Sequence, residues 1–132
     1  MRLFRSFAVM LVLVFGVSVS ATAGSDWIAY SPETFAEARE RHAAVLVDVH
    51  ADWCPTCRAQ KPILDELRAE PELGNVAFIM VSFDDDKEFL QAYRVARQST
   101  IIMFKGTQEV ARSVAETDRE RLREFVLTAA AR

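Results

Sequence analysis

The sequence has few of the residues that build metal centres. It contains two cysteines and two histidines in 132 residues. The cysteines, Cys54 and Cys57, are two residues apart, and a disulfide that closes so short a loop restrains little of the unfolded chain. A zinc site would need two further ligands, for which only His42 and His50 remain as nitrogen donors. A structural disulfide and a zinc site are therefore both poor explanations of the pair, and we expect no metal and no cofactor.

The chain also lacks a basic face, an internal repeat and a linker. Its 16 basic and 19 acidic residues give a net charge of −3, and the basic residues are scattered among the acidic ones. Proteins that bind nucleic acid or anionic membranes gather their basic residues, so neither function is expected. Because 51% of the residues are hydrophobic, the composition predicts one globular domain with a real core.

The long apolar run of the chain, Phe7 to Val19, lies near its N-terminus. Arg2 and Arg5 precede it, and Ala21-Thr22-Ala23 follows, which is the pattern of a secretory signal peptide. The run is shorter than the roughly 20 residues that a membrane-spanning helix needs, so removal after Ala23 is favoured over retention as an anchor. We expect a signal peptide at 1–23, an exported domain at 24–132 and a periplasmic location. The mature chain would carry 14 basic and 19 acidic residues, a charge of −5.

Hydrophobic periodicity and cap residues predict alternating helices and strands. The expected helices begin at Ser31-Pro32, at the cysteines, after the Asp84–Asp86 run and at Thr117 in a capping box; the expected strands cover 45–49, 76–83, 100–104 and 109–113. The last two strands would form a hairpin. This order predicts an α/β fold, in which a mixed central sheet has a parallel core, a C-terminal hairpin and helices on both faces.

The cysteine pair lies at a junction that favours thiol chemistry. It follows an apolar strand, 45–49, and begins a stretch that is compatible with a helix. The dipole and free N–H groups at a helix N-terminus stabilise a thiolate, which lowers the pKa of the first cysteine. The i, i+3 spacing puts the second sulfur on the same helical face. We therefore predict a reversible dithiol–disulfide pair.

The stretch VLVDVHADWCPTC, from Val45 to Cys57, with Pro62 five residues later, resembles the thioredoxin superfamily. The resemblance covers residues 25–130 and implies the thioredoxin fold and a thiol-disulfide oxidoreductase. It also implies that Cys54 is an exposed nucleophile and Cys57 a more buried resolving thiol. The Pro-Thr dipeptide between the cysteines is similar to that of exported reductants, including those of cytochrome c maturation. The run from Ala51 to Cys54 is similar to the C-terminal domain of the transmembrane thiol-disulfide interchange protein.

These likenesses suggest a reductant of disulfide-bonded proteins, with a membrane thiol-disulfide interchange protein as its electron donor. Residues expected at the substrate surface are Trp53, Pro55, Thr56, Ser99 and Thr100.

Asp48 is the third residue to which the resemblance assigns chemistry, as a proton donor or acceptor for the resolving cysteine. A charged group in an apolar strand is costly without a partner, which independently predicts a perturbed pKa. The alternative is an aspartate at the strand end that simply reaches solvent. His50 occupies a position where thioredoxins commonly carry an aromatic residue. An imidazole there can tune a nearby thiolate, but we expect a packed or solvated histidine instead.

Two positions depart from the family pattern. Ser99 replaces a cis-proline, and because a non-proline cis bond costs about 3 kcal/mol, the loop must be either strained or trans. That loop normally pairs with substrate and screens the cysteines, so Ser99 changes substrate choice or admits a metal. The alternative function is accordingly a binding module that holds a metal or iron–sulfur cluster at the two cysteines. Met80 stands near a position that often carries a lysine, and without that positive charge Asp48 should be harder to ionise.

Overall fold

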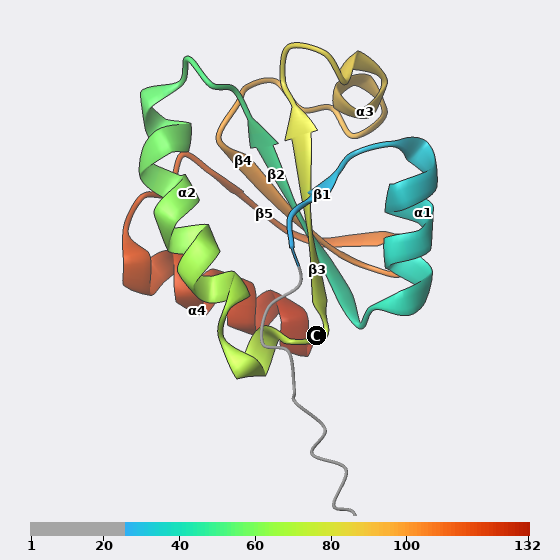
Figure 1. Cartoon of the computed structure of the whole chain (residues 1–132), viewed down its shortest axis with the longest axis vertical. Helices are drawn as coiled ribbons and strands as arrows, with labels where there is room; N and C mark the ends of the chain where they lie inside the picture. The colour runs from blue at the N-terminus through green and yellow to red at the C-terminus, as the bar shows by residue number, and fades with distance from the viewer. Residues whose placement is uncertain (1–25) are drawn as a thin grey trace, which may run out of the picture.

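A five-stranded sheet in the order β1-β3-β2-β4-β5 runs through the middle of the protein (Figure 1). The computed structural model describes residues 26–132, so the expected signal peptide lies outside the described residues. The strands are β1 (Ile28–Ala29), β2 (Ala44–His50), β3 (Val76–Ser82), β4 (Thr100–Lys105) and β5 (Gln108–Val114). The helices are α1 (Pro32–Arg41), α2 (Pro55–Arg68), α3 (Lys87–Ala92) and α4 (Arg119–Ala131), with a short 3-10 turn, η1 (Pro71–Leu73). Within 26–132, no helix combines the length and apolar character needed to cross a membrane.

Strand β2 lies at the centre of the sheet and positions the site. It pairs in parallel with β3, where Asp48 lies opposite Met80, and antiparallel with β4, where Val49 lies opposite Thr100. Strands β4 and β5 form the C-terminal hairpin. The expected mixed sheet with a parallel core is confirmed, and β2 is buried on both faces because helices cover both sides.

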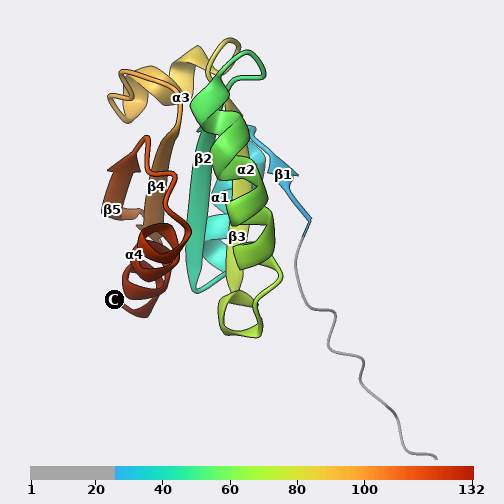
Figure 2. The ribbon, with the colours of Figure 1, turned by 90° about the vertical axis from the view of Figure 1, so that its left-hand side faces the viewer.

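Two separate cores lie on the two faces of the sheet. Phe35 of α1 and Phe89 of α3 pack together at 5.6 Å between ring centroids on one face, and α2 and α4 cover the other face (Figure 2). Successive side chains of a strand point to opposite faces. Val47 and Val49 enter the first core and Leu46 enters the second. Asp48 and His50 share the face of Leu46, which is the face that α2 covers.

Three local features differ from the sequence-based expectation. Strand β1 was not predicted, because two residues are too short to show a period. Helix α4 begins one residue later than expected: Asp118 is its N-cap and accepts the Arg121 N–H at 3.0 Å. Asp86 is the N-cap of α3, yet its side chain accepts the Ser82 N–H at 2.7 Å instead of capping the helix.

Candidate active site

Cys54 is the N-cap residue of α2, and Cys57 lies in the first turn of that helix. The backbone at Cys54 is extended, and its Sγ accepts the N–H of Cys57 at 3.1 Å. A capping side chain accepts such an N–H because the first turn of a helix has no internal partner for it. The placement predicted from the sequence is confirmed, and the sulfur occupies the position at which a helix best stabilises negative charge.

The two thiols differ in acidity. Burial by itself would raise the pKa of Cys54, but hydrogen bonds from the Cys57 side chain, from Ser99 and from the Cys57 N–H lower that pKa. Burial and the hydrogen bond to Cys54 raise the pKa of Cys57. When the reduced pair loses a proton, Cys54 therefore loses it first and Cys57 keeps its own. Both residues are free thiols here.

The expected exposure of Cys54 is wrong for this conformation. Cys54 is 1% exposed and Cys57 is fully buried. Because the Cys54 sulfur caps the helix, it points back toward the first turn, where the Ser99 side chain contacts it. Of the residues expected at the substrate surface, Trp53, which is 55% exposed, and Pro55 are exposed. Thr56 is half-buried.

The loop before β4 brings Ser99 against both sulfurs. Its Oγ lies 3.2 Å from Cys54 Sγ and 3.1 Å from Cys57 Sγ. No peptide bond within residues 26–132 is cis, so the loop takes the trans form, and Ser99 instead has a left-handed backbone with φ 61°. The β2–β4 pairing fixes this position, because the Ser99 N–H donates to the Val49 carbonyl at 2.8 Å. The sequence indicates the importance of this position but not the contact of its side chain with both sulfurs.

Ser99 and Thr100 were expected to contact substrate, but both are buried, at 1% and 2% exposure. The backbone N–H and carbonyl of Ser99 are both paired inside the protein, the carbonyl with the Ala115 N–H at 2.9 Å. Neither backbone group is therefore free to bond to a substrate backbone in this conformation. Contact of Ser99 and Thr100 with substrate thus stays a prediction.

Asp48 is buried at 1% exposure, and neither of its carboxylate oxygens has a hydrogen-bond partner. Burial raises its pKa to about 7; Lys61 opposes this rise, and Asp65 adds to it. The perturbed pKa predicted from the sequence is confirmed, and the solvent-exposed alternative is wrong. Met80 does stand opposite Asp48, as expected.

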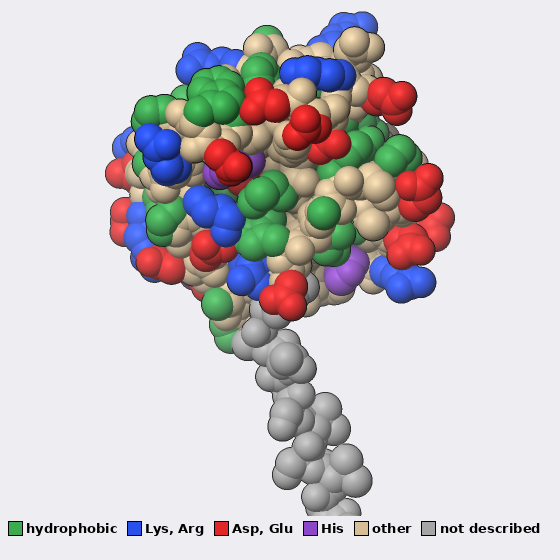
Figure 3. Space-filling view, turned by 45° about the horizontal axis from the view of Figure 1, so that its top comes forward, with side chains coloured by type: hydrophobic (Ala, Val, Ile, Leu, Met, Phe, Trp, Pro, Cys, Tyr) green, Lys and Arg blue, Asp and Glu red, His purple; other side chains and the backbone are tan. Residues whose placement is uncertain are grey.

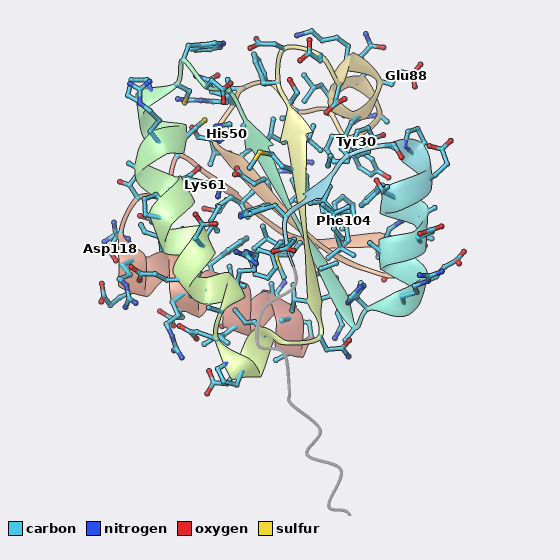
Figure 4. All side chains as sticks on the ribbon, viewed as in Figure 1. Tyr30, His50, Lys61, Glu88, Phe104 and Asp118 are labelled. Carbon is cyan, nitrogen blue, oxygen red and sulfur yellow. The ribbon has the colours of Figure 1, made fainter. Side chains whose placement is uncertain are left out.

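Lys61 is the charged residue that sequence reasoning missed. It lies four residues after Cys57 on α2, so the two share a helical face, and that spacing was the available signal. Its Nζ binds Asp65 at 2.7 Å and lies 4.8 Å from the centre of the Trp27 ring. Figure 4 shows Lys61 on α2 and His50 at the end of β2, on the same side of the sheet.

His50 lies between two carboxylates. Its Nδ1 is 3.8 Å from the Asp48 carboxylate and its Nε2 is 3.4 Å from Asp52, whose side chain is fully exposed. The His50 side chain is 13% exposed, as expected for a packed histidine. No cluster of three or more histidine, cysteine or acidic side chains suited to a metal occurs in the described part of the chain. The binding-module alternative therefore gains no further ligand from the fold.

The surface beside the cysteines is acidic and carries the exposed tryptophan. Trp53 donates its indole N–H to Asp84 at 2.8 Å. An adjoining pocket is lined by His50, Asp52 and the Asp84–Asp86 run, among others. Several acidic side chains gather on this end of the molecule in Figure 3. Trp53 is thus held at the surface, and packing in the core does not explain why a tryptophan occupies this position.

Known proteins match this chain in sequence and in structure. The family model described as Thioredoxin matches residues 26–128. A thioredoxin of Chlamydia pneumoniae is 39% identical over 82 residues, which are 62% of this chain and 78% of that protein. A protein disulfide-isomerase of Aspergillus niger is 30% identical over 105 residues, 77% of this chain and 20% of that protein. The crystal structure of Trxlp from Edwardsiella tarda has a TM-score of 0.73 and 42% identity, and the match covers 76% of this chain and 97% of that one.

These matches do not distinguish among branches of the family, so the finer resemblance to cytochrome c maturation proteins stays a prediction. The fold, the cysteine pair at the start of α2 and the match over residues 26–128 agree with one another. The chain belongs to the thioredoxin family, and it is a thiol-disulfide oxidoreductase.

Proposed function

We propose that this protein is an exported reductant, which passes two electrons from Cys54 and Cys57 to a disulfide in a protein substrate. The observation that carries the proposal is the asymmetry of the pair. Cys54 accepts the Cys57 N–H at 3.1 Å and has a lowered pKa, while Cys57 is fully buried and has a raised pKa. Both sulfurs are buried, and the difference in acidity assigns Cys54 as the attacking thiolate and Cys57 as the resolving thiol.

The chemistry proceeds in two exchanges. The Cys54 thiolate attacks one sulfur of the substrate disulfide, forms a mixed disulfide and expels the other substrate sulfur as a thiolate, which takes up a proton. Cys57 then loses its proton and attacks Cys54 Sγ, which releases the second substrate sulfur and closes the Cys54–Cys57 disulfide. The substrate gains two electrons and two protons. The protein becomes the oxidised partner.

Asp48 is the proposed acceptor of the Cys57 proton. It shares the α2 face of the sheet, no hydrogen bond holds either of its oxygens, and its pKa is about 7. A base works best when its pKa is near the operating pH. In this role Asp48 takes the proton when Cys57 attacks and returns it to solvent afterwards.

The reducing direction rests on the Pro55-Thr56 dipeptide and on Asp48. An exported reductant needs a supply of electrons, and we assign that supply to a membrane thiol-disulfide interchange protein. A measured reduction potential below about −150 mV agrees with this direction, and a more positive one places the protein among the oxidants.

Export to the periplasm is supported by the sequence of residues 2–23. We expect the purified cell-envelope protein to begin at Gly24, which N-terminal sequencing of material expressed from the full gene will reveal. A variant with Ala21 and Ala23 both changed to leucine should keep residues 1–23, because the small-residue cleavage pattern is lost. Recovery of uncleaved wild-type protein in the membrane fraction would favour an anchor instead.

A trapping experiment tests the function and its partners together. The Cys57→Ser variant should accumulate mixed disulfides through Cys54, because the resolving sulfur is absent. These adducts, identified by mass, should include both exported substrates and a membrane donor. The matched control is the Cys54→Ser, Cys57→Ser double variant, which should capture nothing. Equal capture by the double variant would contradict the assignment of Cys54.

A further inference from the structure

One hydroxyl group lies within hydrogen-bonding distance of both sulfurs. Ser99 Oγ is 3.2 Å from Cys54 Sγ and 3.1 Å from Cys57 Sγ, and all three residues are buried. A serine hydroxyl has one proton to donate and lone pairs with which to accept. It can therefore donate to a thiolate on Cys54 while it accepts the S–H proton of Cys57.

The surrounding backbone holds this hydroxyl in place. Ser99 has φ 61°, a conformation that non-glycine residues adopt rarely and keep only when neighbouring structure imposes it. Its N–H donates to the Val49 carbonyl at 2.8 Å, and its carbonyl accepts the Ala115 N–H at 2.9 Å. The Gln60 side chain adds a longer bond to that carbonyl at 3.4 Å. Ser99 is thus attached to β2, to the segment after β5 and to α2, the helix that carries the cysteines.

We propose that Ser99 is a catalytic residue, whose hydroxyl donates a hydrogen bond to the Cys54 thiolate and thereby stabilises the reduced form of the protein. The inference rests on the proposed function and goes beyond it, since it assigns the control of thiolate stability and reduction potential to one side chain. The lowering of the pKa of Cys54 by Ser99 agrees with this role.

The Ser99 hydroxyl can donate its hydrogen bond to whichever of the two sulfurs is negatively charged at each stage of the exchange. When Cys54 bonds to the substrate sulfur, it loses its charge and no longer needs the donor. Cys57 then gives up its proton, and Ser99 Oγ already lies 3.1 Å from the Cys57 sulfur. Donation moves from the first sulfur to the second through rotation of the O–H bond alone. No electron or proton leaves Ser99 in this sequence.

The effect of Ser99 on the reduction potential depends on whether the dithiol form or the disulfide form carries the negative charge. A thiolate accepts a strong hydrogen bond, whereas a neutral disulfide accepts a weak one. The hydroxyl therefore favours the dithiol, and its removal should make the protein a stronger reductant. This direction agrees with the general rule that a disulfide is more oxidising when the corresponding dithiol is stabilised.

Two variants separate the hydroxyl from the backbone conformation. Ser99→Ala and Ser99→Gly both remove the donor, but glycine adopts positive φ readily and alanine does not. We expect both to raise the pKa of Cys54 by about one unit, measured from the pH dependence of its alkylation. Both should lower the equilibrium constant for reduction by glutathione about tenfold, the lower end for a hydrogen bond to a charged group. That change corresponds to a potential about 30 mV more negative.

The possible results test the role of Ser99 separately from the proposed reductase function on which that role rests. Ser113→Ala, which removes a hydroxyl on β5, serves as the control and should match the wild type. A shift confined to Ser99→Ala would assign the effect to backbone strain and overturn the inference. Values within twofold of wild type in both variants would also overturn it. Failure of the wild-type protein to exchange disulfides at all would instead reject the proposed function.

Discussion

Replacement of Cys54 by serine should reduce disulfide turnover to the rate measured without protein. The hydroxyl of serine cannot form the mixed disulfide through which exchange proceeds, so the loss should be complete at every pH. The variant should keep its fold, because serine is among the best N-cap residues and can accept the same N–H of Cys57. Reduction of insulin disulfides with dithiothreitol as the electron source measures the effect.

Ser113→Ala is the control, since it changes a side chain on β5 and keeps both sulfurs. It should retain turnover within a fewfold of the wild type. The wild type should also contain little metal after anaerobic purification. Stoichiometric iron, zinc or copper together with weak turnover would contradict the enzyme and favour the binding module.

Replacement of Asp48 by asparagine should slow reduction at pH 7 by about a hundredfold, the low end of what general acid–base catalysis contributes. In the wild type the rate should rise with pH through about 7, because Asp48 must be ionised to accept the Cys57 proton and its pKa is about 7. The asparagine variant should lack that inflection. Rates measured from pH 5 to pH 9 show both effects.

Lys61 and His50 also face Asp48, and Asp65 acts on it through α2. Lys61→Met should move the inflection to higher pH, because Lys61 is the positive charge that lowers the pKa of Asp48. Glu40→Gln, which neutralises an exposed carboxylate on α1, should leave the profile unchanged. An identical profile for wild type and Asp48→Asn would eliminate Asp48 as the base.

The Asp48→Asn substitution should also stabilise the fold at alkaline pH. The pKa of Asp48 rises from 3.8 to about 7 on folding, so between these values the folded state binds more protons than the unfolded state. Stability therefore falls as pH rises through this window. Asp48→Asn should remove the fall, which is about 4 kcal/mol at most. Urea unfolding at pH 5 and pH 8 measures the difference, and an equal pH dependence in both proteins would refute the burial of a titrating Asp48.

Local signals in the sequence predicted most of the fold and the position of the two cysteines at the start of a helix. Ser31-Pro32 began α1 as expected, and the apolar run before the cysteines formed β2. These elements are decided by residues close together in the chain, through capping groups and hydrophobic periods. The helix start at Cys54 is local in the same sense, so the placement and acidity of that thiol could be predicted before any tertiary contact was known.

Tertiary structure decided the environment of each reacting group. The contact of Ser99 with both sulfurs joins residues 42 and 45 positions apart, and it exists because β4 pairs antiparallel with β2. The burial of Asp48 depends on α2 lying over its face of the sheet, and the burial of Cys54 depends on the loop before β4. Hydrogen-bond partners and solvent access are set by chain segments that meet only on folding, so a sequence pattern identified the thiols while the packing around them determined their burial and their contact with Ser99.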